Sequence, residues 1–211
     1  MNFRNFIESQ VDLSTSFLFD SKNLYKEMAI QNPEALKKTQ NAMQFITDNQ
    51  LSGVLVGGMA YSHHHIDRPN KTDVDFLTDD IDGVKQALKK NRMMHAPLAG
   101  GEMFGGITVP ELDADFLDAN IGNAGLNKYL INTSQVANIG GVKFKVADPS
   151  VLAIMKLATG REKDMNDAFG LFSVVDIESL KKHVMNLEKH LPEDTDAETI
   201  ISYAQAMKQA A

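Results

Sequence analysis

The sequence predicts an α+β fold in which a mixed β-sheet flanked by helices is followed by a helical C-terminal part. Short apolar runs bounded by glycine or aspartate, typical of strands, recur between residues 52 and 147. Helical spacing of apolar residues precedes them, and nearly everything after residue 149 follows a helical pattern. We therefore expect a core with N-terminal helices over residues 1–148 and a helical part over residues 149–211.

The first half of the chain supplies one clear helix and two strands around a glycine turn. In "NPEALKKTQNAMQFITDNQ", residues 32–50, Pro33 suits a first helical position and the apolar residues form an approximate stripe. The apolar run "SGVLVGG", residues 52–58, predicts a buried strand that stops at two glycines, after which "MAYSHHH" opens a helix. The strand "VDFL", residues 74–77, follows.

The second half adds a capped helix, further strands and the helical end. "TDDIDGVKQALKKN", residues 78–91, reads as an amphipathic helix, and residues 93–109 and 111–120 read as strands separated by glycine turns. Gly140 and Gly141 predict the turn of a hairpin over residues 134–147. Asp148 can cap, and Pro149 can start, the helix that leads into the C-terminal part.

Composition excludes several classes of function. At 211 residues the chain can bury a substantial core, as one large domain or a core with an appendage. It has no cysteine, which rules out disulfides, thiolate metal sites and cysteine nucleophiles. We find neither an apolar stretch long enough to span a membrane nor an export signal, so we expect a cytoplasmic protein. The net charge of -7 argues against a general positive field for nucleic acid, although a local basic patch remains open.

Two aspartates one residue apart are the first candidates for chemistry. In a strand, Asp73 and Asp75 project from the same face, which is costly beside a core unless protons or cations neutralise them. The pattern recurs, because "DVDFL" at 73–77 is echoed by "DADFL" at 113–117. If the two strands are neighbours, several carboxylates converge, and such oxygen ligands suit Mg²⁺ or Mn²⁺. The alternative is that some of these aspartates are solvated at strand ends or cap helices.

Gly57 and Gly58 form the second candidate. A glycine turn from a strand into a helix exposes backbone N–H groups beside the positive end of the helix dipole, which suits phosphate. An ordinary tight turn is the alternative. Together, phosphate-binding N–H groups and a divalent cation at the ends of adjacent strands are what a nucleoside triphosphate requires.

These residues resemble the polymerase-beta-like nucleotidyltransferases, whose signature is an apolar strand, two glycines or Gly-Ser, a short helix, and Asp-apolar-Asp. The combination of "GGMAYSHHHIDRPNKTDVDFL" with the later "VLAIMKLATGREKDMND" is similar to the bacterial group that includes the abortive-infection toxins. The resemblance covers roughly residues 50–172. One departure is that Arg68 lies five positions before Asp73, where four is commoner in the group.

The resemblance implies a role for each matching residue. Asp73 and Asp75 would bind two divalent ions, and Asp115, preferred over Asp113 because it precedes Phe-Leu as Asp75 does, would be the third carboxylate and assist deprotonation of the acceptor hydroxyl. Strand alternation predicts that Asp113 and Asp115 share a face. The residues expected to bind the nucleotide are Gly57, Gly58, Arg68, Lys156, Lys163 and Asp164.

Other features have plain structural interpretations. His63, His64 and His65 point in three directions on a helix and cannot chelate one ion, so a solvated or partner-facing helix end is expected. Glycines 100, 101, 105 and 106 fit either a mobile flap or hairpin turns. Without the resemblance, Lys156 reads as a lysine that extends along an apolar helix face to reach solvent.

The leading functional prediction is a nucleotidyltransferase that moves a nucleoside monophosphate from a triphosphate to an acceptor hydroxyl with release of pyrophosphate, using Mg²⁺ or Mn²⁺. The acceptor could be transfer RNA, a protein hydroxyl or a small molecule, and a toxin or phage-defence role with an antitoxin partner is one option. The alternative is a catalytically silent binding or regulatory protein with the same fold. A third option is a metal-binding structural protein, whose metal binding would not depend on nucleotide.

Overall fold

The computed structural model describes residues 33–64, 74–98, 105–139, 141–191 and 195–210. The described residues divide into two units, one up to Asp148 and one from Pro149 onward, and each is described by itself. Among the described residues, none of the helices combines the length and apolar character that crossing a membrane requires.

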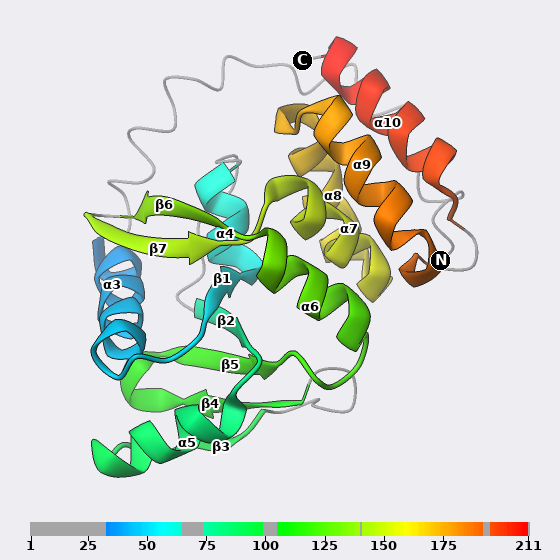
Figure 1. Cartoon of the computed structure of the whole chain (residues 1–211). Coiled ribbons are helices and arrows are strands. Elements are labelled where there is room, and N and C mark those ends of the chain that lie inside the picture. The colour runs from blue at the N-terminus through cyan, green and yellow to red at the C-terminus, as the bar shows by residue number, and fades with distance from the viewer. Residues whose placement is uncertain (1–32, 65–73, 99–104, 140, 192–194, 211) are drawn as a thin grey trace. The chain divides into compact units, whose positions relative to one another are not determined.

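The first unit is built on a seven-stranded mixed sheet in the order β3-β4-β5-β2-β1-β7-β6 (Figure 1). The neighbouring pairs β2/β5 and β1/β7 are parallel, and the other neighbours are antiparallel. The strands are β1 (Val54–Val56), β2 (Val74–Thr78), β3 (Ala96–Pro97), β4 (Gly106–Val109), β5 (Ala114–Asp118), β6 (Gln135–Ile139) and β7 (Val142–Val146).

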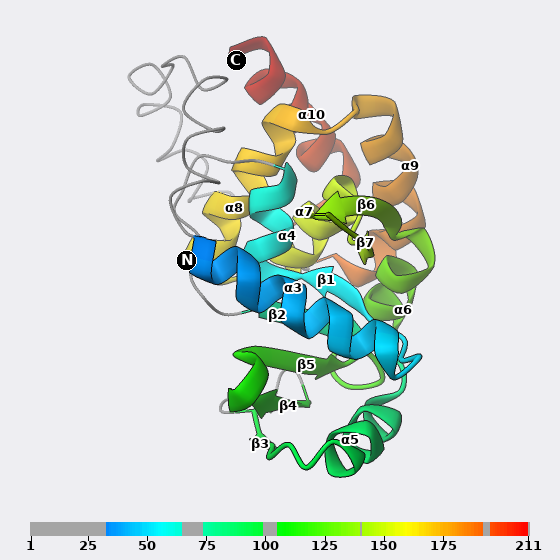
Figure 2. The same cartoon turned by 90° about the vertical axis from the view of Figure 1, so that its left-hand side faces the viewer.

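Helices connect and cover these strands. Helix α3 crosses one face of the sheet in Figure 2, and α6 lies on the other side. Aspartate and asparagine cap two of the helices, since Asp80 accepts the N–H of Gly83 and Asn123 that of Leu126. The helices of this unit are α3 (Pro33–Asp48), α4 (Gly57–His64), α5 (Ile81–Lys90), the 3₁₀ turn η2 (Pro110–Leu112) and α6 (Ala124–Thr133).

Aromatic residues fill the core beneath α3. Phe76 of β2 stacks on Phe116 of β5 at 5.6 Å between ring centroids and meets Phe144 of β7 edge-on at 5.5 Å. All three rings are buried. Each such side chain contributes roughly 1.5–3 kcal/mol through burial. Because side chains alternate along a strand, the residues next to these phenylalanines, Asp75 and Asp115, belong to the opposite face.

The second unit is helical, as the sequence predicts. Asp176 caps one helix by accepting the N–H of Ser179, and Lys208 donates to the carbonyl of Val175, just after the end of α8, at 2.7 Å. Phe169 contacts both Phe172 and Tyr203, which joins α8 to α10. The helices are α7 (Pro149–Thr159), α8 (Glu162–Val174), α9 (Ile177–Leu187), the 3₁₀ turn η3 (Glu188–His190) and α10 (Ala197–Ala210).

Candidate active site

The two copies of the D-x-D-F-L motif lie side by side in the sheet. Strands β2 and β5 are parallel neighbours, and their register pairs Asp75 with Asp115, as well as the phenylalanines and leucines that follow them. Paired residues on adjacent strands lie about 5 Å apart and share a face. Both aspartates are half-buried. The sheet therefore brings two carboxylates together on one face, close to where β1 ends and α4 begins.

Gly57 lies directly against Asp75, one member of this pair. Its backbone φ is +61°, in the left-handed region, and it sits at the junction of β1 and α4. A Cβ added to Gly57 would lie only 1.8 Å from Oδ2 of Asp75 and 2.6 Å from its Cγ. Only glycine therefore lets the turn fit against the carboxylate. This contact explains why the position needs glycine, which the glycine pattern in the sequence alone did not show.

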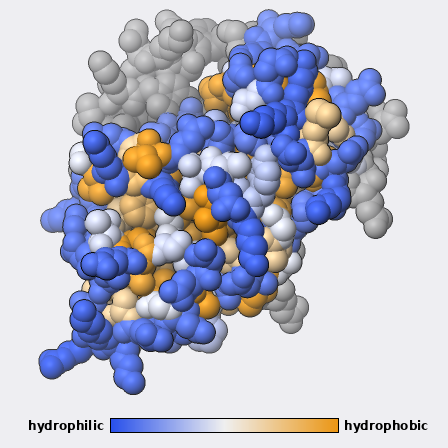
Figure 3. Space-filling model, in the orientation of Figure 1, coloured by the Kyte–Doolittle hydropathy of each residue, from blue (hydrophilic) through white to orange (hydrophobic). Residues whose placement is uncertain are grey.

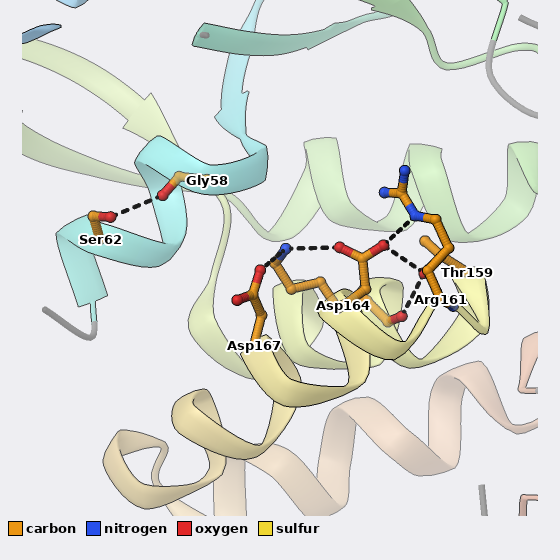
Figure 4. Close-up of polar contacts among 7 residues, drawn as sticks. Gly58, Ser62, Thr159, Arg161, Asp164 and Asp167 are labelled. Atoms are coloured by element: carbon orange, nitrogen blue, oxygen red, sulfur yellow. Dashed lines mark hydrogen bonds and ion pairs between the residues drawn. The ribbon is translucent and has the colours of Figure 1, made fainter. Parts of the chain in front are cut away.

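Helix α4 starts at Gly57, so its N-terminal end lies next to Asp75. Gly58 lies in the first turn of α4, and its carbonyl accepts the hydroxyl of Ser62 at 3.0 Å (Figure 4). The first N–H groups of a helix lack intrahelical partners and carry partial positive charge. The arrangement provides a carboxylate pair beside a helix N-terminus, which can accommodate a cation and a phosphate group respectively.

Asp113 occupies a different environment from Asp115. It has a left-handed backbone, with φ 49° and ψ 48°, and ends the turn η2, so β5 begins one residue later. The expected alternation of Asp113 and Asp115 along one strand is therefore interrupted. The side chain of Asp113 accepts a hydrogen bond from Lys38 of α3 at 2.8 Å. This bond and one to Glu34 raise the pKa of Lys38 above its usual value.

Thr108 is a neighbour that the sequence did not single out. It lies opposite Asp115 in the β4/β5 register and is half-buried. The row across this face therefore runs Val56, Asp75, Asp115, Thr108. No short motif marks this threonine, because its position depends on the register of an antiparallel pair.

Two predicted site residues, Asp73 and Arg68, lie outside the described residues. Within the part of the chain that the structure describes, no group of three or more histidine or acidic side chains surrounds a common point that could hold a metal. Asp75 and Asp115 supply two hard oxygen ligands of the type that Mg²⁺ and Mn²⁺ prefer, so the donor set fits such a cation.

The helical unit holds Lys156 in a buried ion-pair cluster. Its Nζ lies 2.6 Å from Oδ2 of Asp167 and 3.2 Å from Oδ1 of Asp164, and all three side chains are less than a tenth exposed. Asp167 was not among the predicted site residues, although its spacing of three from Asp164 in "KDMND" places both on one face of α8. Lys163 is exposed. The structure thus brings Lys156 and Asp164 together and leaves Lys163 apart from them.

Asp164 has further partners. Its Oδ2 accepts hydrogen bonds from the hydroxyl of Thr159 and from Nε of Arg161 (Figure 4). Burial raises the pKa of Asp164, but the charge of Lys156 and these two hydrogen bonds outweigh it and hold the pKa below its usual value. Two cations and two carboxylates are thereby balanced in the cluster.

The described histidines of α4 do not form a chelating set. Nε2 of His64 lies 2.8 Å from the carbonyl oxygen of Ala147, and the rings of His63 and His64 meet edge-on at 5.0 Å. Burial lowers the pKa of both imidazoles. His64 therefore joins the end of α4 to the segment after β7, while His65 lies outside the described residues.

Comparison with protein-family models matches residues 34–210 to a family described as nucleotidyltransferase of unknown function (DUF6036). The chain belongs to this family. Its members are grouped by sequence as nucleotidyltransferases, so this DUF6036 protein is a nucleotidyltransferase-like protein. No curated protein matched the chain.

Several solved structures are similar to this DUF6036 protein. An antigenic nucleotidyltransferase-like protein from Paracoccidioides brasiliensis is 14% identical, with a TM-score of 0.49 and coverage of 81% of this chain and 93% of the other. The polyadenylate synthase of Megavirus is 15% identical, with a TM-score of 0.43 and coverage of 82% and 38%. JHP933 from Helicobacter pylori is 14% identical, with a TM-score of 0.40 and coverage of 83% and 91%.

Proposed function

We propose that this DUF6036 protein transfers a nucleoside monophosphate from a nucleoside triphosphate to an acceptor hydroxyl and releases pyrophosphate. The observation that carries the proposal is the in-register pair of Asp75 and Asp115, with Gly57 packed against the first of them. A conformation that only glycine tolerates beside a carboxylate, at the start of a helix, is a specific arrangement that a solvated strand end does not require.

The residues of the chain have distinct tasks in this reaction. Asp75 and Asp115, together with Asp73, would hold Mg²⁺ or Mn²⁺, which when bound neutralises charge that develops on the phosphates. The N–H groups of Gly57 and Gly58 donate to phosphate oxygens. Asp115 accepts the proton of the acceptor hydroxyl. The oxygen of that hydroxyl forms a bond to the α-phosphorus while the bond from the α-phosphorus to pyrophosphate breaks.

The sequence resemblance supports further proposals about nucleotide-binding residues and about the biological role. The residues proposed to contact the nucleotide are Arg68, Lys156, Lys163 and Asp164. From the similarity to the abortive-infection group we also propose that the protein is a toxin in phage defence, which an antitoxin protein inhibits.

One observation favours the alternative of a catalytically silent binding or regulatory protein. Lys156, proposed to reach the phosphates, is held by two buried aspartates. Phosphate binding by this lysine requires it to exchange or share those partners, whereas a binding protein would use the same cluster only to join α7 to α8.

The decisive experiment is transfer of label from each α-³²P nucleoside triphosphate, with Mg²⁺ or Mn²⁺, to fractions of RNA, protein and small molecules. Asp75→Asn and Asp115→Asn remove a charge without changing size, and Asp118→Asn, at the far end of β5, is the matched control. Label transferred by the native protein and the control but not by the two site variants supports the proposal. Equal transfer by all four proteins, or none by any, contradicts it and favours the silent alternative.

A further inference from the structure

In the part of the chain that the structure describes, the sheet ends in two edge strands that differ in how they are protected. At one edge lies β3, which has two residues, one of them Pro97. At the other lies β6, which has five residues and contains neither proline nor a charged side chain (Figure 1). Soluble proteins usually prevent edge strands from pairing with other chains by keeping them short or by placing proline or charges in them. The edge formed by β6 lacks these protections and can accept a further strand.

The outer side of β6 presents backbone groups in a defined order. Gly141 has φ +91°, as in the second position of a type I′ turn, and Ile139 pairs with Val142 across this turn. In such a hairpin the pair next to the turn exchanges hydrogen bonds, and bonded and non-bonded pairs alternate from there. The N–H and C=O groups of Val136 and Asn138 are therefore directed away from β7. The described residues supply no backbone hydrogen bond to these groups.

Two lysines of β7 lie beside this edge. Lys143 and Lys145 are opposite residues of β6 in the register and share one face of the hairpin. Both are exposed, and no acidic side chain of the described residues pairs with either of them. Residues 134–147 contain no acidic residue, and Asp148, which follows them, accepts a hydrogen bond from Gln135. This face of the hairpin is therefore basic, although the chain carries a net charge of -7.

A groove lies between the β6/β7 hairpin and the segment at the end of α3. It has a volume of about 370 Å³, and its walls include Ile46, Leu51, Val136, Lys143, Phe144 and Lys145. Val136 is 68% exposed, whereas Ile46 and Phe144 are buried. In Figure 3, apolar and hydrophilic surface adjoin at the left of the molecule, where Figure 1 places α3 and the hairpin. The groove thus offers apolar contact beside the two lysines.

These features together favour one kind of occupant. A strand added to β6 forms backbone hydrogen bonds with it, and every second side chain of that strand lies on the face of the lysines. Acidic residues at those positions would meet Lys143 and Lys145. A second copy of the chain is a poor match, because its own β6/β7 hairpin brings lysines and no acidic residue, which places like charges close together. A nucleic-acid strand lacks the peptide groups that extend a sheet.

From these observations we propose that the outer edge of β6 binds an extended acidic peptide segment of a partner protein, which joins the sheet as an additional strand. The acidic side chains of that segment pair with Lys143 and Lys145, and Val136 and the groove provide apolar contact. This binding does not depend on the proposed function, because none of these residues belongs to the carboxylate site.

The test is fluorescence anisotropy of the full chain with a labelled synthetic peptide of alternating glutamate and valine. A second peptide of the same sequence carries a methyl group on every backbone nitrogen, which removes its hydrogen-bond donors and leaves its charge unchanged. The variant K143Q/K145Q removes the two charges beside β6, and the matched control K89Q/K90Q removes two charges from exposed lysines of α5 in the same unit. Val136→Pro removes an outward N–H from the edge. Thermal unfolding checks that the variants remain folded.

The acidic peptide should bind the native protein saturably. K143Q/K145Q should weaken this binding by about five- to tenfold, as expected for the loss of two exposed ion pairs, whereas K89Q/K90Q should weaken it by less than about twofold. Val136→Pro should weaken it on the order of tenfold, and the methylated peptide should lose more than that, because backbone hydrogen bonds to the edge are missing.

Several results would overturn the proposal. They are absence of saturable binding, equal weakening by the two lysine double variants, or undiminished binding of the methylated peptide. The methylated peptide tests the edge on the native protein even if Val136→Pro fails to fold. Single-stranded RNA that displaces the peptide and binds Val136→Pro as tightly as the native protein would identify a general anion site instead. Self-association that Val136→Pro abolishes, measured by analytical ultracentrifugation, would identify a second copy of the chain as the occupant.

Discussion

Replacement of Gly57 by alanine tests whether the turn and Asp75 form one fixed unit. The new Cβ would lie 1.8 Å from Oδ2, 2.6 Å from Cγ and 2.9 Å from Cβ of Asp75. Rotation of the carboxylate about χ1 can move the oxygen and Cγ, but the Cβ of Asp75 moves only with the backbone of β2. The substitution therefore has to separate the start of α4 from the strand that carries the aspartate.

The magnitude follows from two contributions. An alanine in the left-handed region costs about 1–2 kcal/mol. Forcing extra volume into a packed site typically costs a further 1–3 kcal/mol or so. Gly57→Ala should therefore lower the free energy of unfolding by about 2–5 kcal/mol, a large part of the roughly 5–15 kcal/mol of a typical domain. A shift of Asp75 by about 1 Å should also reduce transfer activity on the order of 100-fold.

Urea denaturation followed by circular dichroism measures the loss, and two glycines provide matched controls. Gly160 has φ +65° and Gly141 has φ +91°, and a Cβ added to either meets no atom within 4 Å. Alanine at these positions should show the backbone cost alone, about 1–2 kcal/mol. In an Asp75→Ala background the extra cost at Gly57 should shrink, because part of the clash is gone. If Gly57→Ala costs no more than the controls, the close packing of turn and carboxylate is refuted.

Three further predictions concern other contacts in the structure. Lys156→Met should lower stability by about 3–5 kcal/mol in urea denaturation because it leaves two buried carboxylates without their cation, whereas Lys163→Met on the exposed face should change it by less than about 0.5 kcal/mol; equal effects would contradict the buried cluster. Because burial lowers the pKa of His63 and His64 from 6.5, the unfolded chain takes up protons first, so stability measured against pH should fall below about pH 6.5 and level off beneath the folded pKa values. The double variant His63→Gln/His64→Gln should flatten this slope, and an unchanged slope would remove the histidines as its cause. Asp113→Asn, which breaks a part-exposed pair with Lys38, should change stability little, because exposed ion pairs contribute little, and should leave label transfer intact. Asp115→Asn should abolish label transfer.

The parts of the fold that local patterns determine were predictable from the sequence. Apolar runs and turn residues indicated the strands near residues 54–56 and 74–78, and the hairpin at Gly141. Helix α7 begins at Pro149, where proline without a free N–H suits a first turn. These features depend on residues close together in the chain, so spacing and composition are sufficient to identify them.

The contact partners of individual side chains were harder to predict from the sequence. The repeated motif suggested that Asp75 and Asp115 meet, but their parallel register is set by the whole sheet. Asp113 appeared to continue the alternation of β5, and its left-handed backbone and its contact with Lys38 arise from η2 and from α3, far away in the sequence. Likewise, the sequence indicated that Lys156 either extends to solvent or binds phosphate. Its actual pairing with Asp167 could not be predicted, because it depends on how α7 and α8 pack.

Binding of Mn²⁺ in the presence of a nucleoside triphosphate, measured by electron paramagnetic resonance, tests the central claim most directly. Asp75→Asn and Asp115→Asn should each weaken nucleotide-dependent Mn²⁺ binding by more than about tenfold, since even groups that only support metal ligands contribute about 10–100-fold. Asp113→Asn should bind as the native protein does. If Asp113→Asn loses as much affinity as Asp115→Asn, or if all four proteins bind Mn²⁺ alike, the carboxylate pair across β2 and β5 is not the metal site.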